Sequence, residues 1–194
     1  KPLTWRQKLK AVLQACEALL YLHTPDERKP RTLHRDFKPA NILLDPSLHA
    51  YLGDTGFAKA AQRIGDASQL GGATTGRVMG SPGYAHQDVI SGQYSEITEG
   101  FAVGRTLLVV LTRRKPVDIE DEIEADHGDV PFGEVAAAQM AEPGAGWPEE
   151  GGTEIQRLHV GLCVVRKRHQ LKLADVQQSL SALLMSESSS GSEV

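Results

Sequence analysis

The stretch His34-Arg35-Asp36-Phe37-Lys38-Pro39-Ala40-Asn41 decides the fold of this chain, because it brings a carboxylate, a cation and an amide together on one short segment. Two apolar triplets follow, Ile42-Leu43-Leu44 and Ala50-Tyr51-Leu52, and Asp54-Thr55-Gly56 then adds a second carboxylate thirteen residues after Asn41. The triplets predict two short strands, since apolar runs bounded by turn residues favour that structure. We therefore expect the polar side chains on loops beside a strand pair.

In order and spacing, these residues resemble the catalytic loop and the metal-binding turn of protein kinases. Either motif alone is typical of an ordinary loop or turn, but the two motifs together with the flanking strands favour the kinase interpretation. Residues 57–59 and 76–85 are similar to the activation segment of the tyrosine kinase-like group, which includes the receptor-like, Pelle-type kinases. The resemblance implies an α+β protein kinase-like fold. The part present would be the mainly α-helical C-lobe, with short β-hairpins around the catalytic loop, and the N-lobe would be missing.

The same resemblance implies a role for each polar residue in serine/threonine kinase chemistry. Asp36 would accept the proton of the substrate hydroxyl, and Lys38 would offset the charge on the phosphate transferred from ATP. Asn41 and Asp54 would hold Mg²⁺, which prefers hard oxygen ligands and takes the rest of its shell from water and nucleotide phosphates. ATP and a protein substrate are the partners expected from this chemistry.

The resemblance covers most of the chain and divides it into regions. Helical spacing from Leu3 to His23, with Thr4 and Gln7 set as a capping box, predicts the helix before the catalytic loop. Apolar spacing from Leu173 to Leu184 predicts an amphipathic last helix. The expected regions are a C-lobe at 1–185, with the catalytic loop at 34–41, the activation segment at 54–88, the central helix at about 98–112 and an acidic insert at 117–152, and a disordered tail at 186–194.

Hydroxyl groups in the activation segment suggest regulation. A phosphate on Thr74 or Thr75 would pair with Arg35, because guanidinium and phosphate form a strong bidentate contact. Ser81 would lie beside Asp36 in the peptide-binding groove, a position that goes with serine or threonine substrates. The alternative is a plain flexible loop whose hydroxyls are never modified. The acidic run in the insert is usually a solvated face, and a docking surface for a basic partner is the alternative there.

Some features of a complete kinase are absent from the sequence. It has no glycine-rich GxGxxG loop and no strand lysine of the Val-Ala-Ile-Lys type. We therefore expect a fragment or an isolated lobe with negligible catalysis by itself. A net charge of −4 gives no broad basic face for nucleic acid, and no apolar run is long enough to span a membrane. Cys16 and Cys163 lie in apolar helical patterns, which indicates buried thiols in a cytoplasmic protein or in the cytosolic part of a membrane receptor.

Departures from the family pattern keep other functions open. Thr55 replaces the phenylalanine of the DFG motif, and His86-Gln87-Asp88 replaces Ala-Pro-Glu. The arginine that pairs with that glutamate is replaced near Gln170, although Arg168 could reach Asp88. Glu99 stands where the family offers an aspartate to the catalytic loop backbone, and we expect it to keep that contact at shifted geometry. The alternatives to a kinase are a pseudokinase or scaffold lobe without turnover, and a truncated fragment without function.

Overall fold

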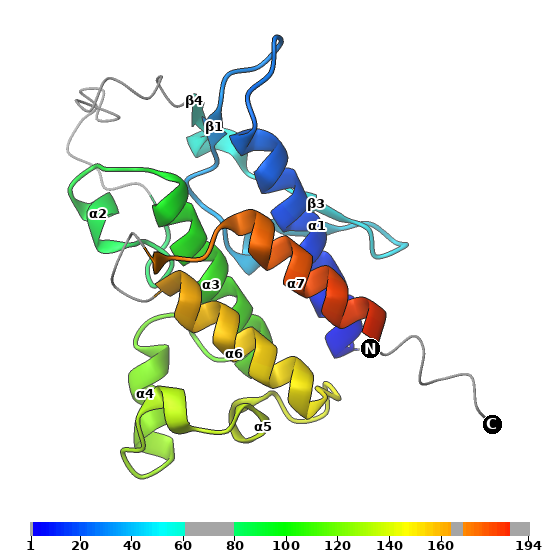
Figure 1. The fold of residues 1–194 in the computed structure, drawn as a ribbon, viewed down its shortest axis with the longest axis vertical. Helices are drawn as coiled ribbons and strands as arrows, with labels where there is room; N and C mark the ends of the chain where they lie inside the picture. Colours follow the sequence, from blue (N-terminus) through cyan, green and yellow to red (C-terminus); the bar gives the residue numbers. More distant parts are fainter. Residues whose placement is uncertain (1, 61–79, 164–168, 187–194) are drawn as a thin grey trace.

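The structure is a computed structural model that describes residues 2–60, 80–163 and 169–186 (Figure 1). Its helices are α1 (Trp5–His23), α2 (Gln87–Ile90), α3 (Glu96–Thr112), α4 (Ile119–Asp126), α5 (Ala137–Met140), α6 (Glu149–Cys163) and α7 (Leu173–Ser186). Its strands are β1 (Thr32–Leu33), β2 (Ile42–Leu44), β3 (Ala50–Leu52) and β4 (Lys59–Ala60). Turns of 3-10 helix lie at Pro39–Asn41, Thr55–Phe57 and Phe132–Glu134. The described part of the chain is therefore rich in helix and has few strands.

Helix α1 forms as the sequence predicts. The Thr4 side chain accepts from the Gln7 backbone N–H and the Gln7 side chain accepts from the Thr4 backbone, so the capping box is complete. The apolar positions face inward, and Leu9, Val12 and Leu19 are almost fully buried. In Figure 1, α1 lies beside α7 and crosses the β2–β3 hairpin.

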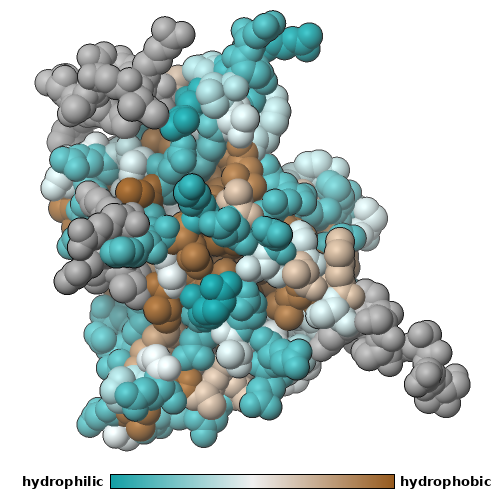
Figure 2. All heavy atoms as spheres, viewed as in Figure 1, coloured by the Kyte–Doolittle hydropathy of each residue, from teal (hydrophilic) through white to brown (hydrophobic). Residues whose placement is uncertain are grey.

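Helix α3 is the central helix of the core. It begins at Glu96, two residues before the predicted start, and a capping box between Ser95 and Thr98 fixes that end. It packs closely on α6, because a Cβ at Gly104 would lie 2.7 Å from the Cys163 sulfur. The pairs α1–α7 and α3–α6 together enclose one hydrophobic core. Figure 2 shows mostly hydrophilic residues on the outside of this face, with hydrophobic residues in the furrows between them.

Both predicted strands are present. β2 pairs antiparallel with β3, with Ile42 opposite Leu52 and Leu43 opposite Tyr51. Residues directly opposite each other share one face of a sheet. Ile42 and Leu52 pack against the core, whereas Leu43 and Tyr51 are each 55% exposed. A second pair, β1 with β4, joins the start of the catalytic loop to residues 59–60.

The stretch 117–152 is more structured than its charge suggests. It contains α4, in which Ile119 and Ile123 are fully buried because a spacing of four residues puts both on one helix face. The solvated acidic face exists on the opposite side, where Asp121, Glu122 and Asp126 are exposed. Helix α6 begins at Glu149, within the segment that the sequence left without an element. The acidic insert is thus an amphipathic part of the core.

Several predictions fall outside the described residues. These are the modification sites Thr74 and Thr75, the pairing of Arg168, and the disordered tail after Ser186. Ser186 itself ends α7, so this residue is helical and not part of the predicted tail. Among the described residues, no helix has both the length and the apolar character needed to cross a membrane.

Candidate active site

Three predicted site residues, Lys38, Asn41 and Ser81, meet at the carboxylate of a fourth, Asp36. Ser81 Oγ donates to Asp36 Oδ1 at 2.8 Å, Lys38 Nζ donates to Oδ2 at 2.6 Å, and Asn41 Nδ2 donates to Oδ2 at 3.0 Å. The Asp36 residue is only 3% exposed. Lys38 also donates to the Ser81 hydroxyl at 2.6 Å. Ser81 thus reaches a buried carboxylate that lies 45 positions earlier in the sequence.

This surrounding keeps Asp36 ionised. Burial raises the pKa of the Asp36 carboxyl, but hydrogen bonds from Lys38, Ser81 and Asn41 outweigh burial, and the pKa lies below its usual value. An ionised carboxylate accepts hydrogen bonds and has no proton to donate. The group is suited to receiving a hydrogen bond from an incoming hydroxyl.

Two buried side chains support the loop from behind. Arg35 adopts a left-handed backbone with φ of 73°, and its N–H donates to Glu99 Oε1 at 2.5 Å. The other Glu99 oxygen pairs with His23, which is also buried. The contact predicted for Glu99 is confirmed. Left-handed residues other than glycine cost about 1–3 kcal/mol, and this hydrogen bond helps to offset that cost.

The role of His23 was not predicted. It lies on the last turn of α1, and its position in the apolar row of that helix was the available signal, although the sequence did not name its partner. His34 is fully buried, and its Nε2 contacts the Gly53 carbonyl oxygen at 2.9 Å. Both histidines thus serve the packing of the loop, and among the described residues no group of three or more His, Cys, Asp and Glu side chains could hold a metal ion.

Asp54 lies beside Asn41 through the backbone. Gly53 N–H donates to the Asn41 carbonyl oxygen at 2.8 Å, and Asp54 follows in a left-handed conformation with its side chain exposed. The Asn41 amide nitrogen is used by Asp36, so the amide oxygen is left for another ligand. One amide oxygen and one carboxylate fit Mg²⁺, provided that other oxygens complete its shell.

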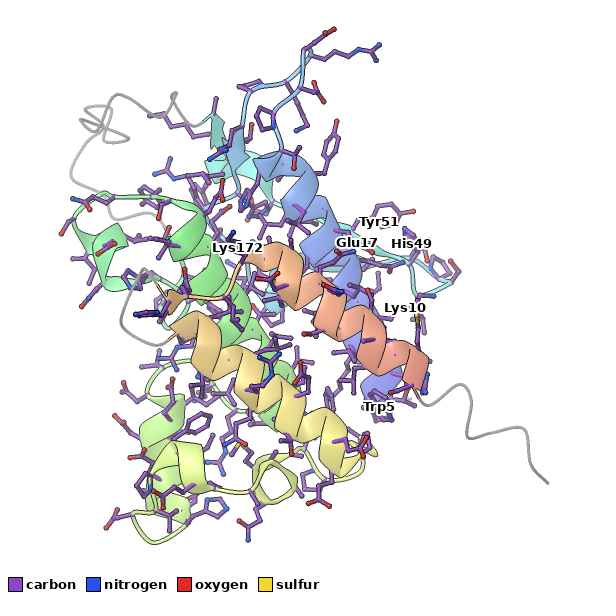
Figure 3. All side chains as sticks on the ribbon, viewed as in Figure 1. Trp5, Lys10, Glu17, His49, Tyr51 and Lys172 are labelled. Carbon is purple, nitrogen blue, oxygen red and sulfur yellow. The ribbon has the colours of Figure 1, made fainter. Side chains whose placement is uncertain are left out.

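The hairpin next to these groups presents an apolar surface that the sequence did not assign. The Leu43 side chain lies over Gly53, where a Cβ would come within 2.7 Å of it. Tyr51 stands opposite Leu43 and contacts His49, with ring centroids 5.1 Å apart. Figure 3 shows Tyr51 and His49 on the hairpin next to α1. The signal for this surface was the strand alternation, which puts Leu43 and Tyr51 on one face.

The departures from the motif have clear local structures. Thr55 is exposed and begins a 3-10 turn, so it fills no core position. His86 Nδ1 accepts from the Asp88 N–H at 3.1 Å and caps α2. Gln170 donates to the carbonyl oxygens of Ile97 and Leu162, at 3.0 and 2.6 Å. Neutral hydrogen bonds therefore connect α3, α6 and residue 170.

Cys16 is a fully buried core residue, as predicted, whereas Cys163 is only half-buried. Burial raises the pKa of the Cys16 and Cys163 thiols to about 12. Only the thiolate is a good nucleophile, so neither side chain is reactive near neutral pH. Both are free cysteines.

Comparison with known proteins places these features in a family. The family described as "Protein kinase domain" matches residues 1–178. The chain is 35% identical over 142 residues to proline-rich receptor-like protein kinase PERK8 of Arabidopsis thaliana, covering 73% of this chain and 19% of that protein. It is 40% identical over 116 residues to receptor-like serine/threonine-protein kinase NCRK of the same plant, covering 59% and 20%. Probable serine/threonine-protein kinase PBL9, also from Arabidopsis thaliana, is 38% identical over 119 residues, covering 61% and 27%. The chain thus spans about a fifth to a quarter of the length of these relatives.

Proposed function

Because the chain belongs to the protein kinase domain family, we propose that its protein transfers the γ-phosphate of ATP to serine or threonine hydroxyls of proteins in signalling. The single observation that carries this proposal is the convergence of Lys38, Asn41 and Ser81 on Asp36. The names of the relatives support serine/threonine specificity and a place among the receptor-like, Pelle-type kinases.

In the proposed reaction, the Asp36 carboxylate accepts a hydrogen bond from the substrate hydroxyl and orients its oxygen. That oxygen forms a bond to the γ-phosphorus while the bond to the β-phosphate oxygen breaks, and the hydroxyl proton passes to Asp36 and on to solvent. A carboxylate with a lowered pKa is a weak base, so orientation is its larger contribution. Lys38, 2.6 Å from Asp36, offsets the negative charge on the moving phosphate.

Asn41 and Asp54 would hold Mg²⁺ together with the ATP phosphates. The bound ion would supply charge neutralisation for the transferring group. The exposed Leu43 side chain, next to Gly53, would offer an apolar surface to the adenine base. These assignments rest on the oxygen ligands that Asn41 and Asp54 offer and on the exposed leucine, all of which lie close to Gly53 in space or in the chain.

The proposed regulation uses the activation segment, residues 54–88. Phosphate on Thr74 or Thr75 would bind Arg35 and order the segment, and Ser81 would keep its hydroxyl at Asp36 to receive serine or threonine substrates. Ser81 lies within hydrogen-bond distance of both Asp36 and Lys38, which supports its part in this assignment.

We also assign residues 1–185 to the large, mainly helical lobe of the kinase fold. The helix pairs and the two small strand pairs support that assignment. The sequence has no glycine-rich loop to clamp the nucleotide phosphates, so we expect the 194-residue chain alone to show negligible turnover. Two free cysteines, one buried and one half-buried, favour a reducing compartment, such as the cytosol or the cytosolic side of a membrane receptor.

A second candidate function is a docking lobe without turnover. The exposed Thr55 favours it, because the phenylalanine normally found there packs inward to set the active state. In that case the cluster around Asp36 would be a structural remnant.

The test is Mg²⁺-dependent phosphorylation of a generic protein substrate by the full-length natural protein and its Asp36→Asn variant. Glu17→Gln is the matched control, since Glu17 is an exposed carboxylate on the outer face of α1 (Figure 3). Turnover that survives Glu17→Gln and disappears in Asp36→Asn would support the kinase. A folded protein without turnover in any form would refute it and leave the docking lobe.

A further inference from the structure

Ser81 stands at the start of a tight turn. The Tyr84 N–H donates to the Ser81 carbonyl oxygen at 3.1 Å, which closes the turn. Pro82 and Gly83 are its central residues, and Gly83 has a left-handed φ of 81°. Proline at the first central position and a left-handed residue at the second are typical of a type II turn. The turn therefore fixes where the Ser81 side chain leaves the backbone.

Gly83 packs against the connection between α3 and α4, residues 113–118, where a side chain has no room. A Cβ at Gly83 would lie 2.7 Å from the Pro116 carbonyl carbon, 2.8 Å from the Pro116 Cβ and 2.8 Å from the Val117 nitrogen. Non-bonded carbon atoms attract each other best at about 3.5–4.0 Å. Two of the three atoms belong to the backbone, so they cannot rotate aside as the end of a flexible side chain can. A side chain at residue 83 would therefore push the turn and the connection apart.

The α3–α4 connection is held firmly in place. It runs between Leu111 and Ile119, which are both fully buried in the core. Arg114 ties it to α4 through an ion pair with Asp126 at 2.6 Å. Pro116 restricts its backbone further, because the proline ring fixes φ. We therefore expect the turn, and not the connection, to move when the two are pushed apart.

The contacts of the Ser81 hydroxyl depend on the position of the turn. Its Oγ lies 2.8 Å from Asp36 Oδ1 and 2.6 Å from Lys38 Nζ. Hydrogen bonds that involve a hydroxyl oxygen have donor–acceptor distances of about 2.5–3.0 Å. A turn displaced by about 1 Å away from the catalytic loop would exceed that range for both contacts.

We propose that Gly83 is a positioning residue, which holds the Ser81 hydroxyl at Asp36 because its lack of a side chain lets the turn pack directly on the α3–α4 connection. The importance of this contact for phosphoryl transfer rests on the proposed function, in which serine or threonine substrates bind beside Ser81. The inference adds a segment between two core helices to the parts of the chain that shape the candidate active site.

The test is a double-mutant cycle, measured by urea unfolding of the 194-residue chain. Ser81→Ala removes the hydroxyl, and its effect on the equilibrium constant of unfolding is measured in the wild type, in Gly83→Ala and in Gly92→Ala. Gly92 is the matched control, because it also has a left-handed φ, 74°, but a Cβ there would meet nothing within 4 Å. We expect Ser81→Ala to raise the constant about tenfold in the wild type and in Gly92→Ala. In Gly83→Ala the rise should be less than about twofold, because the hydroxyl has already lost its partners.

An equal effect of Ser81→Ala in Gly83→Ala and in Gly92→Ala would overturn the inference, since Gly83 would then only relieve strain within the turn. If Gly83→Ala does not fold, Pro116→Gly decides, because it loosens the connection and leaves residue 83 unchanged. The effect of Ser81→Ala should then fall below about threefold, and an effect equal to that in the wild type would overturn the inference.

Turnover gives a second readout in the full-length protein. Gly83→Ala should lower kcat by the same factor as Ser81→Ala, the double variant should lower it no further, and Gly92→Ala should leave it unchanged. A larger loss in the double variant than in Ser81→Ala would overturn the inference. The unfolding cycle needs no turnover, so failure of the kinase proposal would appear separately in the phosphorylation assay.

Discussion

Asp36 and Glu120 are two carboxylates with similar local chemistry and different settings. Asp36 is paired with Lys38 and receives hydrogen bonds from Ser81 and Asn41. Glu120 is paired with Arg105 and with His159, whose Nε2 lies 3.0 Å away. Burial opposes ionisation of Glu120, but hydrogen bonds from His159 and Arg105 outweigh it and lower its pKa to about 2.

The two carboxylates differ in the elements of structure that carry their partners. The partners of Asp36 stand on the catalytic loop and on residue 81, next to the exposed Asp54. Those of Glu120 stand on α3 and α6, where His159 is 2% exposed and also contacts the Gly104 carbonyl oxygen at 2.9 Å. Loops that meet beside an open surface can exchange a partner for a substrate, whereas helices packed in a core cannot. We therefore propose that the paired carboxylate is a reactive group at Asp36. Glu120, Arg105 and His159, here called the Glu120 cluster, instead connect α4 to α3 and α6.

The largest expected effect is a loss of turnover, and it belongs to the Asp36 region. Lys38→Met should reduce kcat of the full-length protein about 10²–10³-fold, because in the proposed reaction it removes the cation that offsets the charge on the transferring phosphate. The free energy of unfolding should fall by about 1 kcal/mol, because the buried Asp36 carboxylate keeps its hydrogen bonds from Ser81 and Asn41 when Lys38 is removed. Phosphorylation kinetics and urea unfolding would measure both. Lys10→Met, on the outer face of α1, is the control (Figure 3), and equal kcat in the two variants would remove Lys38 from the site.

Substitutions in the Glu120 cluster should instead change stability. Arg105→Met should lower the free energy of unfolding by about 2 kcal/mol, less than the about 3–5 kcal/mol of a fully buried pair, because Glu120 is partly solvated. Urea unfolding of the 194-residue chain measures it. The double variant Arg105→Met/Glu120→Gln should regain part of the loss, because no unpaired charge then remains. A double variant less stable than Arg105→Met would contradict the idea that an unpaired Glu120 charge causes the loss of stability.

Acid should weaken the stabilisation from Glu120 over a defined pH range. The folded-state pKa of Glu120, about 2, lies below its usual 4.5, so its stabilisation is complete above pH 4.5 and is lost as the pH falls from 4.5 to 2. After allowance for its partial exposure, we expect about 1–2 kcal/mol of pH-dependent stability from this group. Unfolding of the wild type and Glu120→Gln between pH 2 and 6 checks this. Parallel curves across that range would show that Glu120 is not responsible.

The smallest expected effect concerns a buried hydroxyl next to the Glu120 cluster. Thr106, the neighbour of Arg105 in the chain, is fully buried, and its hydroxyl has no partner among the described residues. Thr106→Val keeps the shape and removes this group, so we expect stabilisation of up to about 1 kcal/mol. A thermal melt beside Thr106→Ser, which keeps the hydroxyl and loses the methyl, measures it. Destabilisation by valine would mean that the hydroxyl is satisfied after all.

The parts of the fold that could be predicted from the sequence are those set by patterns among neighbouring residues. The Thr4 and Gln7 capping box marked the start of α1, and the apolar triplets marked β2 and β3, because those signals act between neighbours in the chain. The Glu120 cluster was not predicted. Its three members are up to 54 positions apart, as Arg105 and His159 show, and helix packing alone brings them together.

The candidate site divides in the same way. Asp36, Lys38 and Asn41 meet on one short loop, so their spacing was informative. The meeting of Ser81 with Asp36 came from resemblance to the family, since no local spacing indicates it. Gly83 and Leu43 were missed because their roles depend on what lies against a turn or across a strand. The contact of Glu99 with Arg35 was expected from the family and took the same form with a longer side chain.

The packing of α7 on α1 has a consequence for synthesis. The described helices of the first and last parts of the chain cover each other, and Val176 and Leu180 of α7 are fully buried. A ribosome must therefore release nearly all of these residues before α1 can lose contact with water on that side. During that time the apolar side of α1 is open to chaperones and to other nascent chains. The rate of translation between the catalytic loop and α7 thus sets how long the unfinished core stays exposed.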